Sequence, residues 1–246
     1  MDRMIYTAMT GASAAAYRQQ LLANNLANAS TPGFRAELAS FRSVPVRGDG
    51  TSSRVFALEA SAGHAGNAGP VNPTGRSLDV AARGNAWFAV QGLDGTEAYT
   101  RGGAFEVGAD GALVSAHGLP VLDDGGAPIS VPAGAQLEFG ADGTLNARVG
   151  EQAPTRVARL KLVTPDAGRR IERSPDGLFR PVQGEALDAD PDARVQGGAL
   201  EGSNVNPLEA MVGMIAVSRQ FEMQMRMLQN GETNDKTASQ LLSLNG

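Results

Sequence analysis

Residues 23–34 read Ala-Asn-Asn-Leu-Ala-Asn-Ala-Ser-Thr-Pro-Gly-Phe, and they close a long amphipathic segment that starts at the first residues of the chain. Proline followed by glycine suits the central positions of a type II turn, and the proline pushes Thr31 out of the helical region. The sequence therefore predicts one helix over residues 1–30 that stops at this turn.

A second helix is predicted over residues 206–244, which open with Asn-Pro-Leu-Glu. Asn206 is a good N-cap, Pro207 fits the first helical position, and Glu209 completes a pattern like a capping box. Residues 229–237 are polar and interrupt the apolar pattern. We therefore expect the helix to bend or fray near Gly231.

Both helices carry apolar or small residues alternately three and four apart, which is typical of a coiled-coil seam. Gly11 costs about 1 kcal/mol relative to alanine inside a helix, so either the helices cross closely there or the glycine is simply tolerated. We expect the two helices to pair as a coiled coil. The first seam comprises Ile5, Ala8, Ala12, Ala15, Gln19, Leu22 and Leu26, and the second Met211, Met214, Ser218, Phe221, Met225 and Leu228.

Short apolar runs fill the middle of the chain, and Asp-Gly occurs at 94–95, 110–111, 124–125, 142–143 and 176–177. Asp-Gly is a strong hairpin signal because both residues tolerate positive φ. An antiparallel sandwich or open barrel is predicted, with Trp87 and Phe88 in its core. The fold class is thus α+β, with an N-terminal helix (1–34), an extended connector (35–75), a β-rich outer domain (76–202) and a C-terminal helix (203–246).

Composition excludes several classes of protein. The net charge is −5 and Lys161 and Lys236 are the only lysines, so neither nucleic acid nor an anionic membrane surface is an expected partner. Cysteine is absent, which rules out disulfides and thiolate metal sites. That absence fits chance as well as passage into an oxidising space. We expect no membrane insertion and no cleaved leader.

No catalytic pattern stands out in the sequence. His64 and His117 lack a second ligand at helical metal spacing and are interpreted as exposed loop residues. There is no nucleophile elbow, phosphate loop or dinucleotide fingerprint. We therefore predict that the protein is not an enzyme and has no catalytic, cofactor or metal site.

Three asparagines, Asn24, Asn25 and Asn28, crowd the end of the first helix although asparagine is a poor residue for a helix interior. The helix end could simply fray before Pro32. The alternative, which we favour, is that these amides link neighbouring helices and fix their register, as a buried coiled-coil asparagine does.

These motifs carry a family resemblance. Residues 23–28 with 31–34, and residues 198–206 (Gly-Ala-Leu-Glu-Gly-Ser-Asn-Val-Asn), resemble the paired terminal signatures of bacterial flagellar rod and hook proteins. The similarity extends through the middle, for example residues 87–90 and 99–105. Within the family, residues 1–9, 206–212 and 218–224 are most similar to proximal-rod members.

The resemblance implies a structural subunit of the proximal rod, which transmits torque from rotor to hook across the periplasm. It implies export by the flagellar type III apparatus, and other rod proteins and copies of itself as partners. Alternatives are a distal-rod or hook-like subunit, or a secreted β-rich module that acts on peptidoglycan. The expected subunit-interface residues are Ile5, Leu22, Asn24, Asn25, Leu26, Asn28, Met214, Phe221, Met225 and Leu228.

Overall fold

The computed structural model describes residues 4–45, 55–166 and 168–243. The chain divides into two compact units, each built from segments that are distant in sequence. Unit 1 comprises Met1–Ala29, Glu37–Gly63 and Val205–Gly246. Unit 2 comprises Ser30–Ala36 and His64–Asn204.

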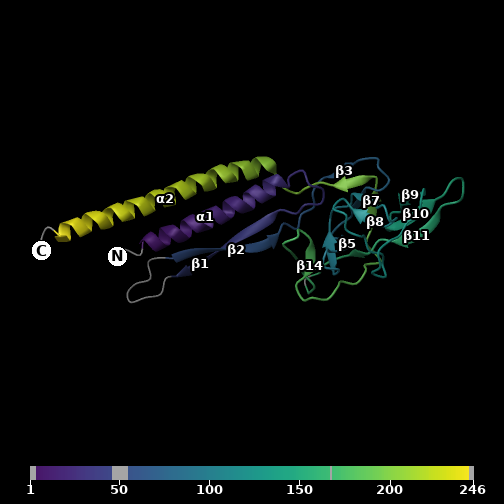
Figure 1. Ribbon diagram of the computed structural model, residues 1–246, viewed down its shortest axis with the longest axis horizontal. Helices are drawn as coiled ribbons and strands as arrows, with labels where there is room; N and C mark the ends of the chain where they lie inside the picture. The colour runs from purple at the N-terminus through teal and green to yellow at the C-terminus, as the bar shows by residue number, and fades with distance from the viewer. Residues whose placement is uncertain (1–3, 46–54, 167, 244–246) are drawn as a thin grey trace. The chain divides into compact units, whose positions relative to one another are not determined.

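Unit 1 pairs the two terminal helices, α1 (Met4–Ala27) and α2 (Pro207–Ser243), side by side (Figure 1). They run antiparallel, because Ile5 near the start of α1 packs on Gly231, whereas Leu22 near its end packs on Gly213. Strand β1 (Glu37–Pro45) contacts α1 and pairs with β2 (Val55–His64) in a two-stranded ribbon. Apolar residues over 35–75 follow no clean two-residue period, so the sequence predicts an extended, partly irregular connector whose first part, residues 34–46, is a strand or an extended arm. The first part is the strand β1, whereas β2 was not predicted.

The helix boundaries follow the predicted chemistry. The Asn206 side-chain oxygen accepts hydrogen bonds from the backbone N–H groups of Leu208 (3.1 Å) and Glu209 (3.3 Å), which confirms the N-cap. After α1, Phe34 N–H donates to the Thr31 carbonyl (3.2 Å) and Gly33 has φ +72°, as a type II turn requires. The predicted fraying at Gly231 is wrong, because α2 continues through it to Ser243, and a bend there stays a prediction.

Unit 2 is built from antiparallel β structure. A five-stranded sheet has the order β12-β5-β6-β14-β13, and a three-stranded sheet has the order β11-β10-β9. Three two-stranded ribbons, β15-β4, β16-β3 and β7-β8, complete the described strands. The bounds are β3 Val71–Pro73, β4 Val80–Ala82, β5 Trp87–Gln91, β6 Glu97–Thr100, β7 Phe105–Val107, β8 Leu113–Ser115, β9 Gln136–Phe139, β10 Thr144–Arg148, β11 Thr155–Arg159, β12 Leu162–Val163, β13 Ile171–Arg173, β14 Phe179–Pro181, β15 Val195–Gly197 and β16 Ala199–Glu201.

All five Asp-Gly sites lie in turns between antiparallel segments, which confirms the hairpin prediction. Four of them connect β5 to β6, β7 to β8, β9 to β10 and β13 to β14. The fifth lies between Leu122 and Pro128, which form an isolated antiparallel bridge. In the first turn, the Asp94 carboxylate accepts hydrogen bonds from the backbone and hydroxyl of Thr96. These contacts hold the turn and lower the pKa of Asp94.

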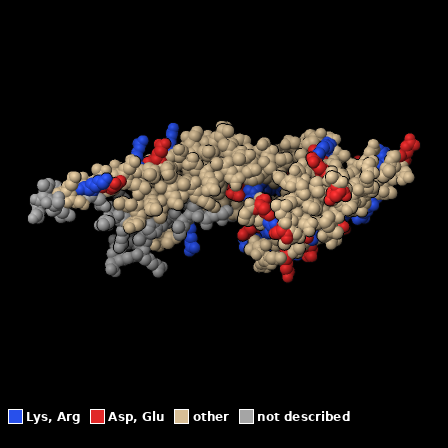
Figure 2. Space-filling view, viewed as in Figure 1, with Lys and Arg blue, Asp and Glu red and all other residues tan. Residues whose placement is uncertain are grey.

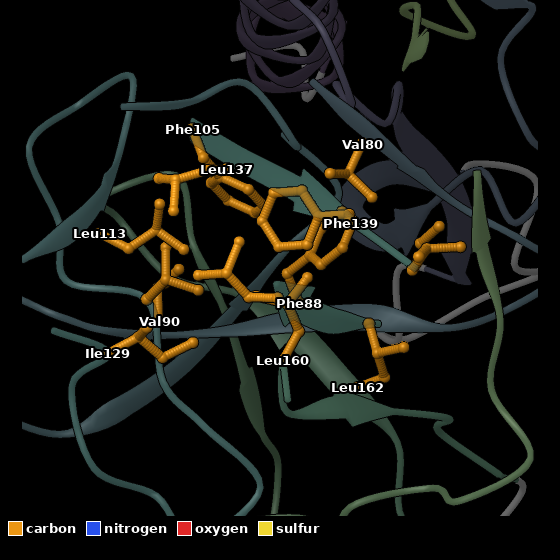
Figure 3. Close-up of a cluster of buried hydrophobic side chains, with 14 of the residues drawn as sticks. Val80, Phe88, Val90, Phe105, Leu113, Ile129, Leu137, Phe139, Leu160 and Leu162 are labelled. Carbon is orange, nitrogen blue, oxygen red and sulfur yellow. The ribbon is translucent and has the colours of Figure 1, made fainter. Parts of the chain in front are cut away.

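The core of unit 2 lies on both faces of β5. Phe88 and Val90 point into one buried cluster, which includes Phe105 and Phe139 (Figure 3). Trp87 and Ala89 belong to a second buried cluster. Successive residues of a strand point to opposite faces, so adjacent aromatic residues anchor separate cores. The prediction that Trp87 and Phe88 are core residues is confirmed.

Candidate assembly surface

At two points the helices of unit 1 meet through a large residue of α1 set against a glycine of α2. A Cβ added at Gly213 would lie 3.2 Å from Leu22 Cδ1, and one added at Gly231 would lie 3.2 Å from Ile5 Cγ1. Between them, a Cβ on Gly11 would lie 2.9 Å from the Gln224 side chain. Gly11 therefore lies at a close crossing, one of the two readings that the sequence leaves open.

The buried face of α1 includes Ala8, Ala12 and Ala15, as the seam pattern predicts. On α2, four of the six predicted seam residues, Met214, Ser218, Phe221 and Leu228, are half-buried, whereas Met211 and Met225 are exposed. Met211, predicted in the seam, is 49% exposed, whereas its neighbour Ala210 is buried. An alanine at position 210 allows close approach of the helices, although methionine is the more apolar residue. The buried or half-buried positions of α2 between residues 207 and 234 are Ala210, Gly213, Met214, Val217, Ser218, Phe221, Gln224, Leu228 and Gly231.

Three predicted interface residues, Ile5, Met225 and Leu228, line one groove of about 830 Å³ beside the last turns of α2. Helix α2 continues for twelve residues past Gly231, the position that Ile5 covers, which is about 18 Å of helix at 1.5 Å per residue. On this extension Lys236 pairs with Glu232 at 2.7 Å. That hydrogen bond lowers the pKa of the Glu232 carboxyl.

The other apolar residues of the predicted set, Leu22, Leu26, Met214 and Phe221, are half-buried. Leu22 packs against Gly213 of the same chain. The remaining exposed fraction of each side chain is available to another subunit, so a role between subunits stays a prediction.

The three predicted asparagines have different environments. Asn25 is buried, and its side chain pairs with the backbone of Glu37: its Nδ2 donates to the Glu37 carbonyl (3.0 Å) and its Oδ1 accepts from the Glu37 N–H (2.9 Å). This amide therefore attaches the start of β1 to α1 within one chain. Asn28 donates to the Asn24 side chain at 2.8 Å along α1. A link to a neighbouring subunit remains a prediction for these residues.

The outward face of α1 is a feature that the sequence analysis missed. Arg18 is the only charged residue in the whole helix, although Tyr6 and Met9 are 66% and 62% exposed and Tyr17 is 41% exposed. A surface helix normally places charged and polar residues opposite its apolar stripe. The near absence of charge over residues 4–27 is visible in the sequence and could have identified this face.

The outward face of α2 changes character along its length. Leu208, Val212 and Ile215 at its start are 70%, 58% and 57% exposed. Charged residues follow at Arg219, Glu222 and Arg226, all exposed. Glu209 is the one charged residue of α2 before Arg219, and Figure 2 shows a largely uncharged surface over this part of the helix, with more blue and red atoms farther along. The uncharged part has the character of a protein–protein contact.

The described residues contain no group of three histidine, cysteine or acidic side chains positioned to hold a metal ion. Neither described helix is both long enough and apolar enough to cross a bilayer. His64, interpreted from sequence as an exposed loop residue, is instead half-buried against Trp87 and Phe179, whereas His117 is exposed.

Comparison with known proteins identifies the family of this chain. Three family models match: "Flagella basal body rod protein" over residues 5–35, "Flagellar hook protein FlgE/F/G D1 domain" over 81–147, and "Flagellar basal body rod FlgEFG protein C-terminal" over 196–241. The chain is 46% identical to the flagellar basal-body rod protein FlgF of Salmonella typhimurium, across 99% of this chain and all of that protein. The chain belongs to the FlgF family of flagellar basal-body rod proteins.

Other members of the FlgF family agree. The Escherichia coli protein is 45% identical over 99% of this chain and 100% of its own length, and the Caulobacter vibrioides protein is 32% identical over 98% of both. A flagellar basal-body rod protein FlgG from Buchnera aphidicola is 29% identical over 96% of this chain. The helices of unit 1 and the β structure of unit 2 are therefore parts of a structural subunit of the flagellar rod.

Proposed function

We propose that this rod subunit belongs to the proximal rod, spans part of the periplasm within it, transmits torque between rotor and hook, and has no enzymatic activity. Its similarity to FlgF proteins over almost the whole chain supports the proximal position. Its partners in this proposal are copies of itself, other proximal-rod subunits, FlgG and the flagellar type III export apparatus.

We further propose that α1 and α2 form an antiparallel coiled coil that stacks helically with its neighbours. Residues 1–34 and 203–246 would supply this inner domain and residues 76–202 an outer β domain, with the chain between them connecting the two. The alternating spacing of four and three along α2, from Ala210 to Gly231, supports the coiled coil. Contacts that repeat from subunit to subunit without closing a ring produce a filament.

One observation carries the assembly role: a 24-residue helix with a single charge exposes Tyr6, Met9 and Tyr17. In a monomer, such a face would remain in water with no charged side chain among its exposed residues. A neighbouring subunit that covers this face would remove its apolar surface from water. Each Å² of apolar surface buried in this way stabilises the contact by about 25 cal/mol.

The test places a charge on this face without disturbing the fold of the monomer. Met9→Asp changes a side chain that is 62% exposed, so helix pairing in the monomer should be retained. We expect cells that carry only this variant to lack completed rods and hooks in electron micrographs of isolated basal bodies.

Asn230→Asp is the matched control, because it adds the same charge at an exposed position on α2. We expect it to support rods and swimming. Complete rods with Met9→Asp would exclude this face from the interface. Rotating flagella in cells that lack the gene altogether would exclude the rod role itself.

A further inference from the structure

The chain crosses between unit 1 and unit 2 at four points. Each crossing lies at an end of one of three short segments of unit 2. The inbound segment, residues 30–36, continues into unit 1 at both of its ends. The return segment, residues 64–70, begins where the ribbon of unit 1 ends, and the outbound segment, residues 199–204, leads towards α2. Torque that travels along the chain from one unit to the other must pass through these segments.

Asn204 binds the other two segments directly. Its backbone N–H donates to the Phe34 carbonyl (3.3 Å), and its side-chain oxygen accepts from the Ala36 N–H (2.7 Å). Its side-chain nitrogen donates to the carbonyls of Ala65 (3.3 Å) and Asn67 (2.8 Å). One asparagine of the outbound segment thus holds both the inbound and the return segments.

Glu201 joins the same segments through charge. One carboxylate oxygen accepts from the Gly69 N–H (3.1 Å) and pairs with Arg35 (2.7 Å), whose side chain is 4% exposed. The other oxygen pairs with Arg101, whose Nε donates to it at 2.8 Å. The Glu201 carbonyl accepts from the Gly33 N–H (2.8 Å). A buried carboxylate with two arginines is costly to separate, because each ion would be left unpaired.

The backbones of the three segments also meet directly. Ala65 N–H donates to the Ala36 carbonyl (2.8 Å), and Gly202 N–H donates to the Pro70 carbonyl (2.7 Å). A Cβ at Gly69 would lie only 2.0 Å from the Gly202 carbonyl oxygen, so no other residue fits there without a backbone shift. At Gly69 and Gly202 the return and outbound segments are therefore packed against each other with no side chain between them.

We propose that Glu201 and Asn204 are positioning residues that lock the inbound, return and outbound segments into a single junction, and that this junction carries torsional load through the subunit. The proposal rests on the proposed function, because only a rod subunit experiences such a load. If the segments were separate, each could twist and fray independently. Tied together by side chains from the outbound segment, they move as one body, and load on any crossing is shared by all of them.

The first experiment measures backbone amide hydrogen exchange in the purified full chain. We expect Glu201→Gln to accelerate exchange in all three segments together, by about tenfold or more, because they open as one cooperative unit. Glu97→Gln is the matched control, since it neutralises another well-buried ion pair of unit 2, with Lys161 (2.8 Å), away from the junction. Faster exchange confined to Gly69, the amide that Glu201 itself accepts from, would overturn the junction.

Should Glu201→Gln unfold unit 2, Asn204→Ala provides the same test, because it removes only neutral hydrogen bonds. Acceleration limited to the Ala36 amide would then overturn the junction, whereas acceleration in all three segments would support it.

The second experiment measures the breakage of flagella under load, in cells whose only copy of the gene carries Asn204→Ala. We expect rods in normal number but several-fold more broken or lost flagella when the viscosity of the medium is raised, and no such loss with Glu97→Gln. Equal breakage in the two strains would overturn the load-carrying role. A wild-type gene that fails to restore rods to cells lacking it would instead overturn the proposed function.

Discussion

Leu22 of α1 lies over Gly213 of α2, with its Cδ1 atom only 3.2 Å from the position that a Cβ on the glycine would occupy. Ile5 and Gly231 repeat this relationship near the other end of α1. A large side chain on one helix thus fills the space that glycine leaves on the other. The register of the helix pair depends on this complementarity of size.

Placing the large side chain at position 213 and a small one at position 22 tests that register, through Gly213→Leu, Leu22→Ala and the double variant that combines them. Gly213→Leu should overpack the pair and cost about 1–3 kcal/mol. Leu22→Ala should lose less than the roughly 2–5 kcal/mol of a fully buried leucine, since Leu22 is half-buried. The double variant should regain most of the loss, as measured by urea unfolding followed by far-UV circular dichroism. A double variant as unstable as the sum of the two singles would show that these residues are not partners.

Asn25→Ala should detach the start of β1 from α1. The variant loses two hydrogen bonds and leaves the N–H and carbonyl of Glu37 without these partners, which costs about 1–3 kcal/mol per buried unsatisfied group. Circular dichroism and amide exchange at Glu37 would measure this. Asn24→Ala, at an exposed position one residue earlier, should change stability by no more than about 0.5 kcal/mol. Equal effects of the two substitutions would contradict the assignment.

Much of the fold follows from local chemistry that the sequence displays. The N-cap at Asn206, the turn at Gly33 and the Asp-Gly hairpins each depend on residues within a few positions of one another, so the sequence predicts them well. The seam of α2 was predicted at Met214, Ser218, Phe221 and Leu228, which are half-buried, but not at its start, because Met211 is more apolar than Ala210 and yet is exposed. A small residue allows close approach of the helices at that position, whereas the apolar pattern favours the larger one.

The junction was beyond sequence analysis for a different reason. Arg35, Arg101 and Glu201 are separated by 66 and 100 positions along the chain, and no local pattern indicates that they meet. The motifs that contain Arg101 and Glu201 were recognised only by resemblance, and Arg35 lies just outside the first motif. The role of Asn25 was similarly hidden, since its partner is the backbone of Glu37, which carries no side-chain signal.

Leu22→Asp or Phe221→Asp should abolish rod assembly while unit 2 stays folded. Both positions lie in the helix contact, where a carboxylate would lose hydration without gaining a partner. Trp87 is the only tryptophan and is buried in unit 2, so its fluorescence reports on that unit alone. We expect reduced helicity by circular dichroism, an unchanged Trp87 unfolding curve and no rods in basal bodies. Rods assembled from either variant would rule out the seam as a requirement.

The stability of unit 2 should fall as the pH is lowered through the range in which His64 titrates. The His64 ring lies 4.7 Å from Phe179 and 5.8 Å from Trp87, and burial, followed by repulsion from Arg35 and Arg173, lowers its pKa. The unfolded chain therefore takes up a proton near pH 6.5, whereas the folded chain does so only at lower pH. The contribution of neutral His64 is complete above the unfolded pKa and is lost as the pH falls through the folded pKa.

Urea unfolding monitored by Trp87 fluorescence, at several pH values from about 7.5 to about 5.5, measures this dependence; the window lies above the ordinary carboxyl pKa values. His64→Phe keeps an aromatic ring between Trp87 and Phe179 but removes the titrating group, so its stability should change little over that range. His117→Gln alters the other histidine, which is exposed, and should leave the wild-type slope intact. A wild-type slope that persists in His64→Phe would show that another group senses the pH.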